Sequence, residues 1–247
     1  MRVWRRLMSG LAAAVLLTAQ PTARLSNETS QAFDTYVRNV EARHDWEASP
    51  ANKSGAMRIA PWGGKTPISV PDGLIHDWIG SLEIPGATVE RALALFQDYG
   101  NYKSIFAPEV IDSKLLERDG NIWRAHLRLR RKNIVTVVLD TDYEVEYTPV
   151  GADGWAILSR STRIAEVDNG KELAPGTGHG YLWRLNSYWL LAPRAAGLYL
   201  ECRSISLSRD IPGALRWLIA PMVSRVPRDS LQATLEEAQR KLVSSAR

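Results

Sequence analysis

The chain has 247 residues, of which 45% are hydrophobic and 23% charged, with 17 glycines, 13 prolines and one cysteine. This composition is that of a folded globular protein and excludes a disordered, collagen-like or disulfide-dense chain. The single cysteine, Cys202, excludes an intrachain disulfide and any zinc or iron–sulfur site built from several cysteines. Nine tryptophans against three phenylalanines indicate a core or pocket with large flat surfaces.

The first 23 residues have the pattern of a secretory signal peptide. Three arginines precede an apolar stretch over residues 7–18, and small residues follow it. The apolar stretch is shorter than the roughly 20 residues that a transmembrane helix needs. We therefore expect an exported protein, periplasmic or secreted, with cleavage after Ala19 or Ala23. An uncleaved membrane anchor is the alternative.

The formal net charge of +4 belongs mostly to this leader. Without residues 1–23, which contain three arginines and no acidic residue, the chain keeps 28 basic and 27 acidic side chains. A nearly neutral protein offers no electrostatic reason to bind nucleic acid, so we expect no such partner.

An amphipathic helix is predicted over residues 30–46. Four apolar or aromatic residues fall on one face of it at helical spacing: Phe33, Tyr36, Val37 and Val40. Residues 47–73 are rich in Gly, Pro, Ser and Lys and have little periodicity, which predicts a long loop. We expect residues 24–73 to form an N-terminal extension and residues 74–247 to form the main domain.

Seven strands are expected in the main domain, because seven stretches with strand character are separated by turn residues. These stretches are 74–84, 110–117, 121–131, 134–147, 155–167, 181–191 and 198–208. Two short helical pieces, 88–97 and 98–108, follow the first strand, and residues 212–223 precede a long closing helix over 228–246. Strands joined by short turns form an antiparallel meander, and the closing helix is long enough to cover its concave face.

The central hairpin has a predicted register. A turn over residues 131–134 gives three cross-strand pairs: Arg124 with Glu144, His126 with Asp142, and Arg128 with Asp140. The alternate positions are mostly apolar, so the charged pairs are expected on the solvated face. Each exposed pair contributes about 0.2–1 kcal/mol and helps to fix the register.

Four short segments carry a resemblance to a known family. They are LFQDYGNY at 95–102, FAPEV at 106–110, SKLL at 113–116 and ISLSRDIP at 205–212. The first three look like the first helices and second strand of the START-like superfamily, which includes polyketide cyclase and lipid-transport proteins. The fourth, with the closing helix, looks like that superfamily's last strand and gripping helix.

This resemblance covers about residues 74–246 and implies an α+β helix-grip fold. In that fold a seven-stranded curved antiparallel sheet wraps on a long C-terminal helix, with two short helices after the first strand. The resemblance also implies a deep, largely apolar cavity between sheet and helix. Members of the superfamily bind lipids, sterols, hormones or polyketides, and a minority are enzymes.

Polar and aromatic residues that the expected register places inside this cavity form the candidate ligand-binding site. Pairing of odd-numbered positions in two successive hairpins gives Tyr143 and Arg163 from the first, and Trp183, Trp189, Glu201 and Arg203 from the second. A buried Arg or Glu must be paired or hydrogen-bonded, so the charged residues form a structural ion pair or hold a polar group of the ligand. A one-residue bulge would reverse these faces.

No catalytic residue, metal site or cofactor is predicted. The four histidines have no i, i+4 spacing and no cysteine partners, which gives a metal site little support: His44, His76, His126 and His179. Cys202, on a strand, is expected to pack as a small hydrophobe. The glycine-rich residues 176–180 precede a strand and are interpreted as a loop at the cavity mouth.

The sequence thus favours binding over catalysis. We expect an exported carrier or binding protein for a hydrophobic small molecule that is lipid, sterol-like or polyketide-like. Such a protein can contact a membrane transiently. The sequence does not determine the oligomeric state. Residues 173–180 or 98–108 would open to admit the ligand.

Two alternatives stay open. The first is an aromatase/cyclase-type enzyme in which Tyr143, Arg163 or Glu201 acts as acid or base. The second is an interaction module that uses aromatic residues of the N-terminal extension, Tyr36, Trp46 and Trp62.

Overall fold

The structure, a computed structural model, describes residues 22–43, 56–132, 136–210 and 213–244, with side chains of the last segment described from residue 225 onward. The predicted signal peptide lies outside the described residues apart from its last two positions, and His44 and Trp46 lie outside them as well. Within the described residues, no helix combines the length and the apolar character needed to cross a membrane.

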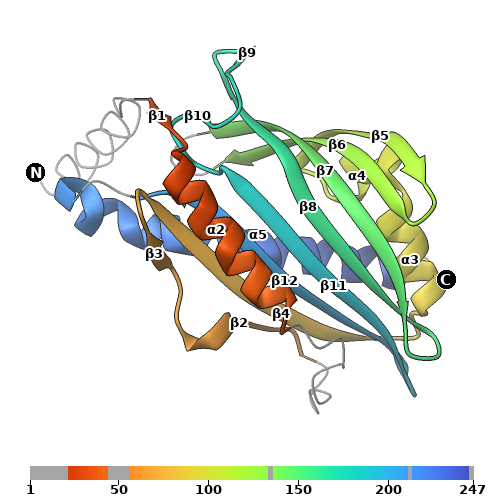
Figure 1. The fold of residues 1–247 in the computed structure, drawn as a ribbon. Coiled ribbons are helices and arrows are strands. Elements are labelled where there is room, and N and C mark those ends of the chain that lie inside the picture. Colours follow the sequence, from red (N-terminus) through yellow and green to blue (C-terminus); the bar gives the residue numbers. More distant parts are fainter. Residues whose placement is uncertain (1–21, 44–55, 133–135, 211–212, 245–247) are drawn as a thin grey trace, which may run out of the picture.

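One ten-stranded antiparallel sheet dominates the fold (Figure 1). Its main path runs β2-β4-β12-β11-β8-β7-β6-β5, while β3 pairs with β4 and β9 with β8. The strands are β2 Arg58–Pro61, β3 Ile68–Val70, β4 Gly73–Pro85, β5 Val110–Asp119, β6 Ile122–Lys132, β7 Thr136–Val150, β8 Gly154–Asp168, β9 Lys171–Glu172, β11 Arg184–Arg194 and β12 Gly197–Arg209. A separate two-stranded pair joins β1, Ala23–Arg24, to β10, Thr177–Gly178.

The seven predicted strands correspond to β4, β5, β6, β7, β8, β11 and β12. The prediction of seven strands in the sheet is wrong, because β2, β3 and β9 add to it. These three strands are only two to four residues long, too short to show a clear alternation of apolar and polar residues. Two of them, β2 and β3, arise from the stretch predicted as a loop.

The register predicted for the central hairpin is confirmed. Arg124 lies opposite Glu144, His126 opposite Asp142, and Arg128 opposite Asp140. The last pair is bidentate, since Nε and Nη2 of Arg128 donate to Oδ1 and Oδ2 of Asp140 at 2.7 Å each.

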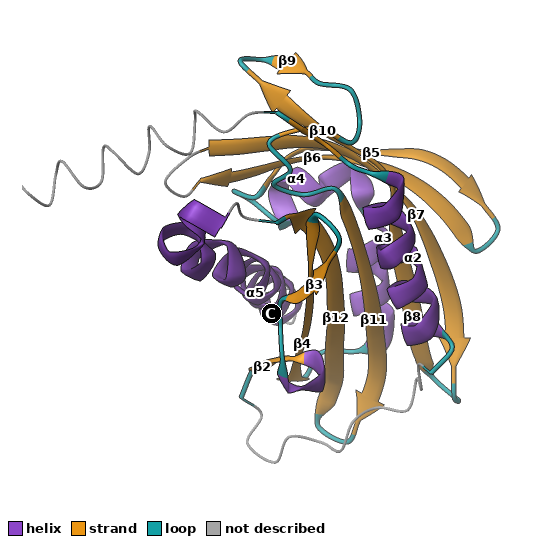
Figure 2. Cartoon of the chain, turned by 60° about the vertical axis from the view of Figure 1, so that its left-hand side comes forward, coloured by secondary structure: helices purple, strands orange, loops and turns teal. Residues whose placement is uncertain are grey.

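The helices lie on both faces of the sheet (Figure 2). After β4 come α3 Val89–Gln97, the 3-10 turn η2 Tyr99–Asn101 and α4 Tyr102–Ile105, which match the two predicted helical pieces. A single helix, α5 Gly213–Ser244, covers both segments predicted at the C-terminus. On the opposite face lies α2, Asn27–Glu41, whose N-cap Ser26 accepts a hydrogen bond from the backbone N–H of Thr29 at 3.1 Å.

Helix α5 packs on β4 through its predicted apolar stripe. The four stripe residues, Leu231, Leu235, Ala238 and Leu242, are all buried. Gly80 of β4 permits this close approach, because a Cβ atom there would come within 2.5 Å of Leu235 Cδ1. The helix and the concave face together enclose one of two apolar clusters.

The second apolar cluster, called the outer cluster, fills the space between α2 and the other face of the sheet. Its buried residues are Phe33, Val37, Val40, Ile75, Trp183, Tyr188, Ile205 and Leu207. Residues 24–73 therefore contribute a packed helix and two sheet strands. Both faces of β4, β11 and β12 are buried as a result.

Candidate ligand-binding site

A cavity of about 450 Å³ lies between the concave face of the sheet and α5. Its volume falls in the range of about 300–1,000 Å³ that is typical of pockets for small molecules. The lining is mainly apolar, and it comes from β4, β5, β6, β7, β8, β11 and β12 together with α3, α4 and α5. Because the strands lie in register, the lining divides into three levels along the cavity.

The deepest level, called the floor, is apolar. Trp189 of β11 lies opposite Ile157 of β8 and Cys202 of β12. The ring of Phe96, from α3, packs on Trp189 with centroids 4.5 Å apart. Cys202 is buried, as the sequence predicts, and burial raises the pKa of its thiol well above the ordinary value. The floor thus offers flat apolar surface and a thiol that stays protonated.

The middle level, called the polar belt, crosses the concave face. Its first row is a cross-strand line of three serines, Ser159, Ser187 and Ser204. Its second row contains Tyr143 of β7, Ser206 of β12 and, opposite Ser206, His76 of β4. Ser208 also lines the cavity, and its Oγ lies 3.0 Å from His76 Nε2.

Two groups of the polar belt are buried without a hydrogen-bond partner in the described part of the chain: the hydroxyl of Tyr143 and Nδ1 of His76. The two side chains are only 5% and 1% exposed. Burial raises the pKa of Tyr143 to about 12 and lowers that of His76 to about 4. Both side chains are therefore uncharged near neutral pH, and each can still form a hydrogen bond.

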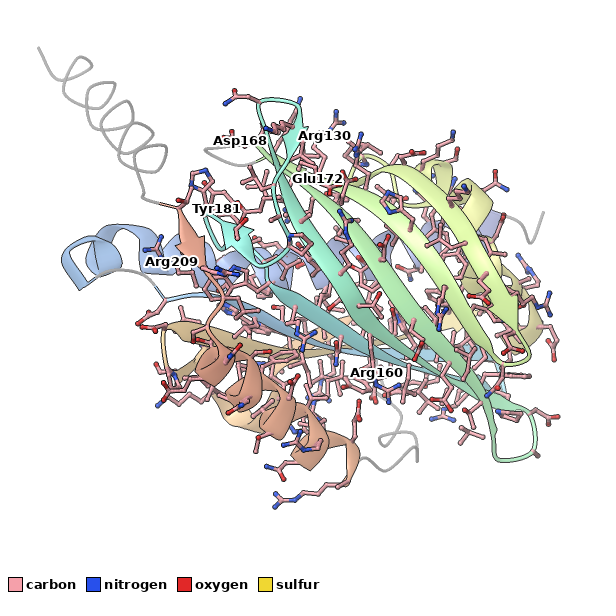
Figure 3. All side chains as sticks on the ribbon, turned by 45° about the horizontal axis from the view of Figure 1, so that its top comes forward. Arg130, Arg160, Asp168, Glu172, Tyr181 and Arg209 are labelled. Carbon is pink, nitrogen blue, oxygen red and sulfur yellow. The ribbon has the colours of Figure 1, made fainter. Side chains whose placement is uncertain are left out.

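The outermost level, called the rim, carries the charged lining residues. They stand at strand ends or beside them: Glu109, Arg130, Arg131, Arg209 and Asp210. Arg131 Nη1 donates to Glu109 Oε1 at 3.1 Å. Figure 3 shows Arg130, Arg209 and Tyr181 at the same end of the molecule, where the loop that precedes β11 also lines the cavity. The predicted mouth loop thus lies at the rim.

That loop is fastened by a buried carboxylate. Glu166, 5% exposed, accepts the backbone N–H of His179 through Oε2 at 2.7 Å and that of Tyr181 through Oε1 at 2.9 Å. The loop is also tied to the N-terminal strand β1, since Leu25 N–H donates to the Gly176 carbonyl at 2.7 Å.

Of the six predicted site residues, the structure brings Tyr143 and Trp189 together in the cavity lining. The placement of Arg163 in the cavity is wrong. A bulge in β8 pairs Tyr143 with Ser161 but Asp142 with Arg163, which turns Arg163 to the outer face. There its guanidinium contacts the carboxylates of Asp142 and Glu172.

The placement of Glu201 and Arg203 in the cavity is wrong as well. Only two residues separate the paired positions Arg194 and Gly197 at the hairpin turn, so odd positions of β11 lie opposite even positions of β12. Even positions of β12 therefore face the cavity and odd positions face outward. Glu201 accepts a hydrogen bond from Tyr199 there, and Arg203 pairs with Asp77.

Trp183 packs in the outer cluster, which also differs from the prediction. Regular pairing of β11 begins at Arg184, so the alternation that points Leu185 and Trp189 into the cavity does not extend to residue 183. Trp183 instead donates its backbone N–H to the Leu207 carbonyl at 2.8 Å.

Sequence reasoning missed His76, Ser187 and the three serines of β12 that line the cavity. The signal was present in the alternation Ser204, Ile205, Ser206, Leu207, Ser208. The prediction assigns bulky and apolar positions to the cavity. In β12, however, the apolar residues Ile205 and Leu207 face α2. Among the described residues, no group of three or more His, Cys, Asp or Glu side chains is placed to hold a metal ion.

No protein-family model matches the sequence, and the comparison with curated proteins gives no match. Among solved structures, TTHA0849 from Thermus thermophilus superposes with a TM-score of 0.50 at 15% identity, over 68% of this chain and 98% of that one. A STAR-related lipid transfer protein from Xanthomonas axonopodis gives a TM-score of 0.45 at 18% identity, over 74% of this chain and 98% of that one. The Zhui aromatase/cyclase from a Streptomyces species gives a TM-score of 0.44 at 13% identity, over 70% of this chain and 93% of that one.

The fold is START-like. The order of elements is the one that the sequence resemblance implies. The chain forms a strand, then two short helices, then an antiparallel meander that returns to the first strand, and finally a long helix on the concave face.

Proposed function

We propose that this protein is a carrier that encloses a hydrophobic small molecule between its sheet and α5. The supporting observation is the cavity itself, about 450 Å³ in volume and lined mainly by apolar side chains. Transfer of apolar ligand surface from water into such a cavity contributes about 25 cal/mol per Å². The lining of the floor supplies flat aromatic surface for this contact.

The carrier is favoured over an aromatase/cyclase-type enzyme. Of the three residues considered as acid or base, Arg163 and Glu201 lie outside the cavity lining and only Tyr143 lies within it. With a pKa raised to about 12, the Tyr143 phenol is a poor base and a weak acid near neutral pH.

We propose further that the protein is exported and that its leader is cleaved after Ala19. Ala23 and Arg24 pair with Gly178 and Thr177 in the mouth loop, so cleavage after Ala23 would remove half of β1. The intact mass of the protein recovered from the cell envelope tests both points. A mature chain that begins at Gln20 is expected. A chain that begins at Arg24, or one that keeps its leader, contradicts the proposed site.

Native mass spectrometry of the mature protein from its own host's envelope, with solvent extraction of bound material, tests the carrier function. We expect a stoichiometric apolar compound. Ser159→Phe, which fills the cavity from β8, should abolish its retention. Thr162→Phe, on the exposed side of the same strand, is the matched control and should retain it. A wild-type protein that stays empty across a lipid panel contradicts the proposal.

A further inference from the structure

We infer that the cavity selects an uncharged ligand with hydroxyl or carbonyl oxygens at two or more positions of an apolar body, and that Tyr143 and His76 determine this specificity. The assignment depends on the proposed binding function and names the ligand class for the same site. It excludes a ligand that places an ionised carboxylate in the polar belt.

The first step concerns the hydroxyl of Tyr143. Six other tyrosines of the described chain have a hydroxyl bonded to a protein group: Tyr36, Tyr99, Tyr102, Tyr147, Tyr188 and Tyr199. Tyr143 lines the cavity and is 5% exposed, and its hydroxyl has no hydrogen bond of ordinary geometry to a described residue. Its polar neighbour Thr141 donates its own hydroxyl proton to the Leu127 carbonyl at 2.7 Å. A buried polar group without a partner is costly, and native proteins rarely leave one unless a ligand or water completes it. An oxygen of the ligand is the partner we assign to it.

The second step concerns His76. Its Nε2 contacts Ser208 Oγ at 3.0 Å, while Nδ1 has no partner in the described chain. The imidazole is 1% exposed and faces the cavity. Three strands, β8, β11 and β12, separate its strand β4 from β7, which carries Tyr143. Measured along the sheet, that separation is about 19 Å at about 4.8 Å per strand, so the two groups contact different atoms of a ligand.

The third step concerns charge. The polar belt contains only tyrosine, serine and an imidazole that burial keeps neutral. The charged lining residues stand at the rim, and the ion pair of Arg203 with Asp77 lies on the other face of the sheet. An ionised ligand group in the polar belt would lose its hydration without meeting an opposite charge. Hydroxyl and carbonyl oxygens meet hydrogen-bond partners there at no such cost.

Three planar probes of similar shape test the inference. They are 9,10-anthraquinone, which has two opposite carbonyls, anthracene, which has none, and anthraquinone-2-carboxylate, which adds a charge. Binding is measured through quenching of tryptophan fluorescence, since Trp189 lines the cavity. We expect wild-type protein to bind the quinone more tightly than anthracene. One hydrogen bond corresponds to a factor of about two to ten in affinity, and this factor is the minimum gain that we expect. The carboxylate should bind more weakly than the quinone.

Tyr143→Phe and His76→Phe should each reduce the ratio of quinone to anthracene affinity, and the double variant should bring it close to one. Tyr147→Phe is the matched control. Its hydroxyl already bonds to Tyr99 and to the Phe96 carbonyl, and it does not line the cavity, so the ratio should not change. Melting temperatures verify folding: Tyr143→Phe loses no internal hydrogen bond and should melt no lower than wild type, unlike Tyr147→Phe.

The outcomes separate the inference from the proposed function. Equal binding of quinone and anthracene, tighter binding of the carboxylate, or an unchanged ratio in both cavity variants overturns the inference and leaves hydrophobic binding intact. Failure of wild-type protein to bind any of the three probes contradicts the proposed function, and the inference with it.

Discussion

Arg203 and Asp77 form a buried bidentate ion pair on the face of the sheet opposite the cavity. Nε and Nη2 of Arg203 donate to Oδ1 and Oδ2 of Asp77 at 3.0 and 2.6 Å. Tyr36 of α2 also donates to Asp77, at 2.7 Å, and the ring of Trp62 lies over the guanidinium with its centroid 4.1 Å away. The pair thereby connects the N-terminal segment to the central strands.

Asp77→Ala should lower the free energy of unfolding by about 3–5 kcal/mol, because it leaves a buried guanidinium without its carboxylate. Urea denaturation measures this loss. The double variant Asp77→Leu/Arg203→Met removes both charges and should be much less destabilised than the single variant. A loss below about 1 kcal/mol in Asp77→Ala would show that the pair is solvated.

The central hairpin was predictable because its sequence restricts its register. Three pairs of a basic side chain with a carboxylate coincide only if the strands of Arg128 and Asp140 meet as observed, and a shift by one residue would bury those polar side chains. The outer strands β2, β3 and β9 were not predictable in this way. Their pairing depends on contacts with β4 and β8 that two to four residues cannot encode by alternation.

The candidate site was harder to predict because both faces of β12 are buried. Ile205 and Leu207 pack in the outer cluster under α2, so apolar character does not identify the cavity face. The face on which each side chain lies then depends on two local features. These are the two-residue turn before Gly197 and the bulge between Ser161 and Arg163. Neither has a pattern that a single sequence reveals. For this reason Trp189 was placed correctly while Arg203 was not.

The contact of α5 with β4 gives a second prediction. Leu235 is fully buried beside Gly80, so Leu235→Asp places an unpaired charge between helix and sheet. We expect a loss of at least about 4 kcal/mol in unfolding free energy, or failure to fold. Val243→Asp, at an exposed position of the same helix, should change stability by no more than about 0.5 kcal/mol. An unchanged melting temperature in Leu235→Asp would contradict the helix-grip packing.

His76 gives stability a defined pH dependence. Burial lowers its pKa from 6.5 to about 4 in the folded protein, so the unfolded chain takes up a proton first as the pH falls. The contribution of the neutral imidazole to the free energy of unfolding is fully present above pH 6.5. It is lost between pH 6.5 and about 4, and the total loss is about 3 kcal/mol. The hydrogen bond from Arg128 lowers the pKa of Asp140 below 3.8. Protonation of this carboxylate therefore changes the stability only at a pH below the His76 window.

Urea denaturation at about pH 7 and about pH 4.5, on either side of most of this window, measures the effect. The difference between the two unfolding free energies should be smaller in His76→Gln than in wild type by about 2–3 kcal/mol. Identical differences in the two proteins would mean that the imidazole is already protonated or solvated in the folded state.

Glu166 determines how firmly the mouth loop is held. The side-chain carboxylate of Glu166 accepts hydrogen bonds from the backbone N–H groups of His179 and Tyr181. The backbone carbonyl of Glu166 accepts a hydrogen bond from the backbone N–H of Leu173 at 2.8 Å. Glu166→Ala leaves the first two amides without acceptors. Hydrogen exchange at residues 179 and 181 should accelerate by about tenfold or more, which corresponds to the loss of one hydrogen bond each.

Glu172→Ala is the matched control for this variant. Glu172 is adjacent to the same loop, but its side chain pairs with Arg163 on the outer face and accepts no loop amide among the described contacts. Exchange at residues 179 and 181 should therefore stay at the wild-type rate in Glu172→Ala. Since the loop borders the rim, release of a bound probe should also be faster in Glu166→Ala alone. Wild-type exchange and release rates in Glu166→Ala would mean that β1, not the carboxylate, holds the mouth loop closed.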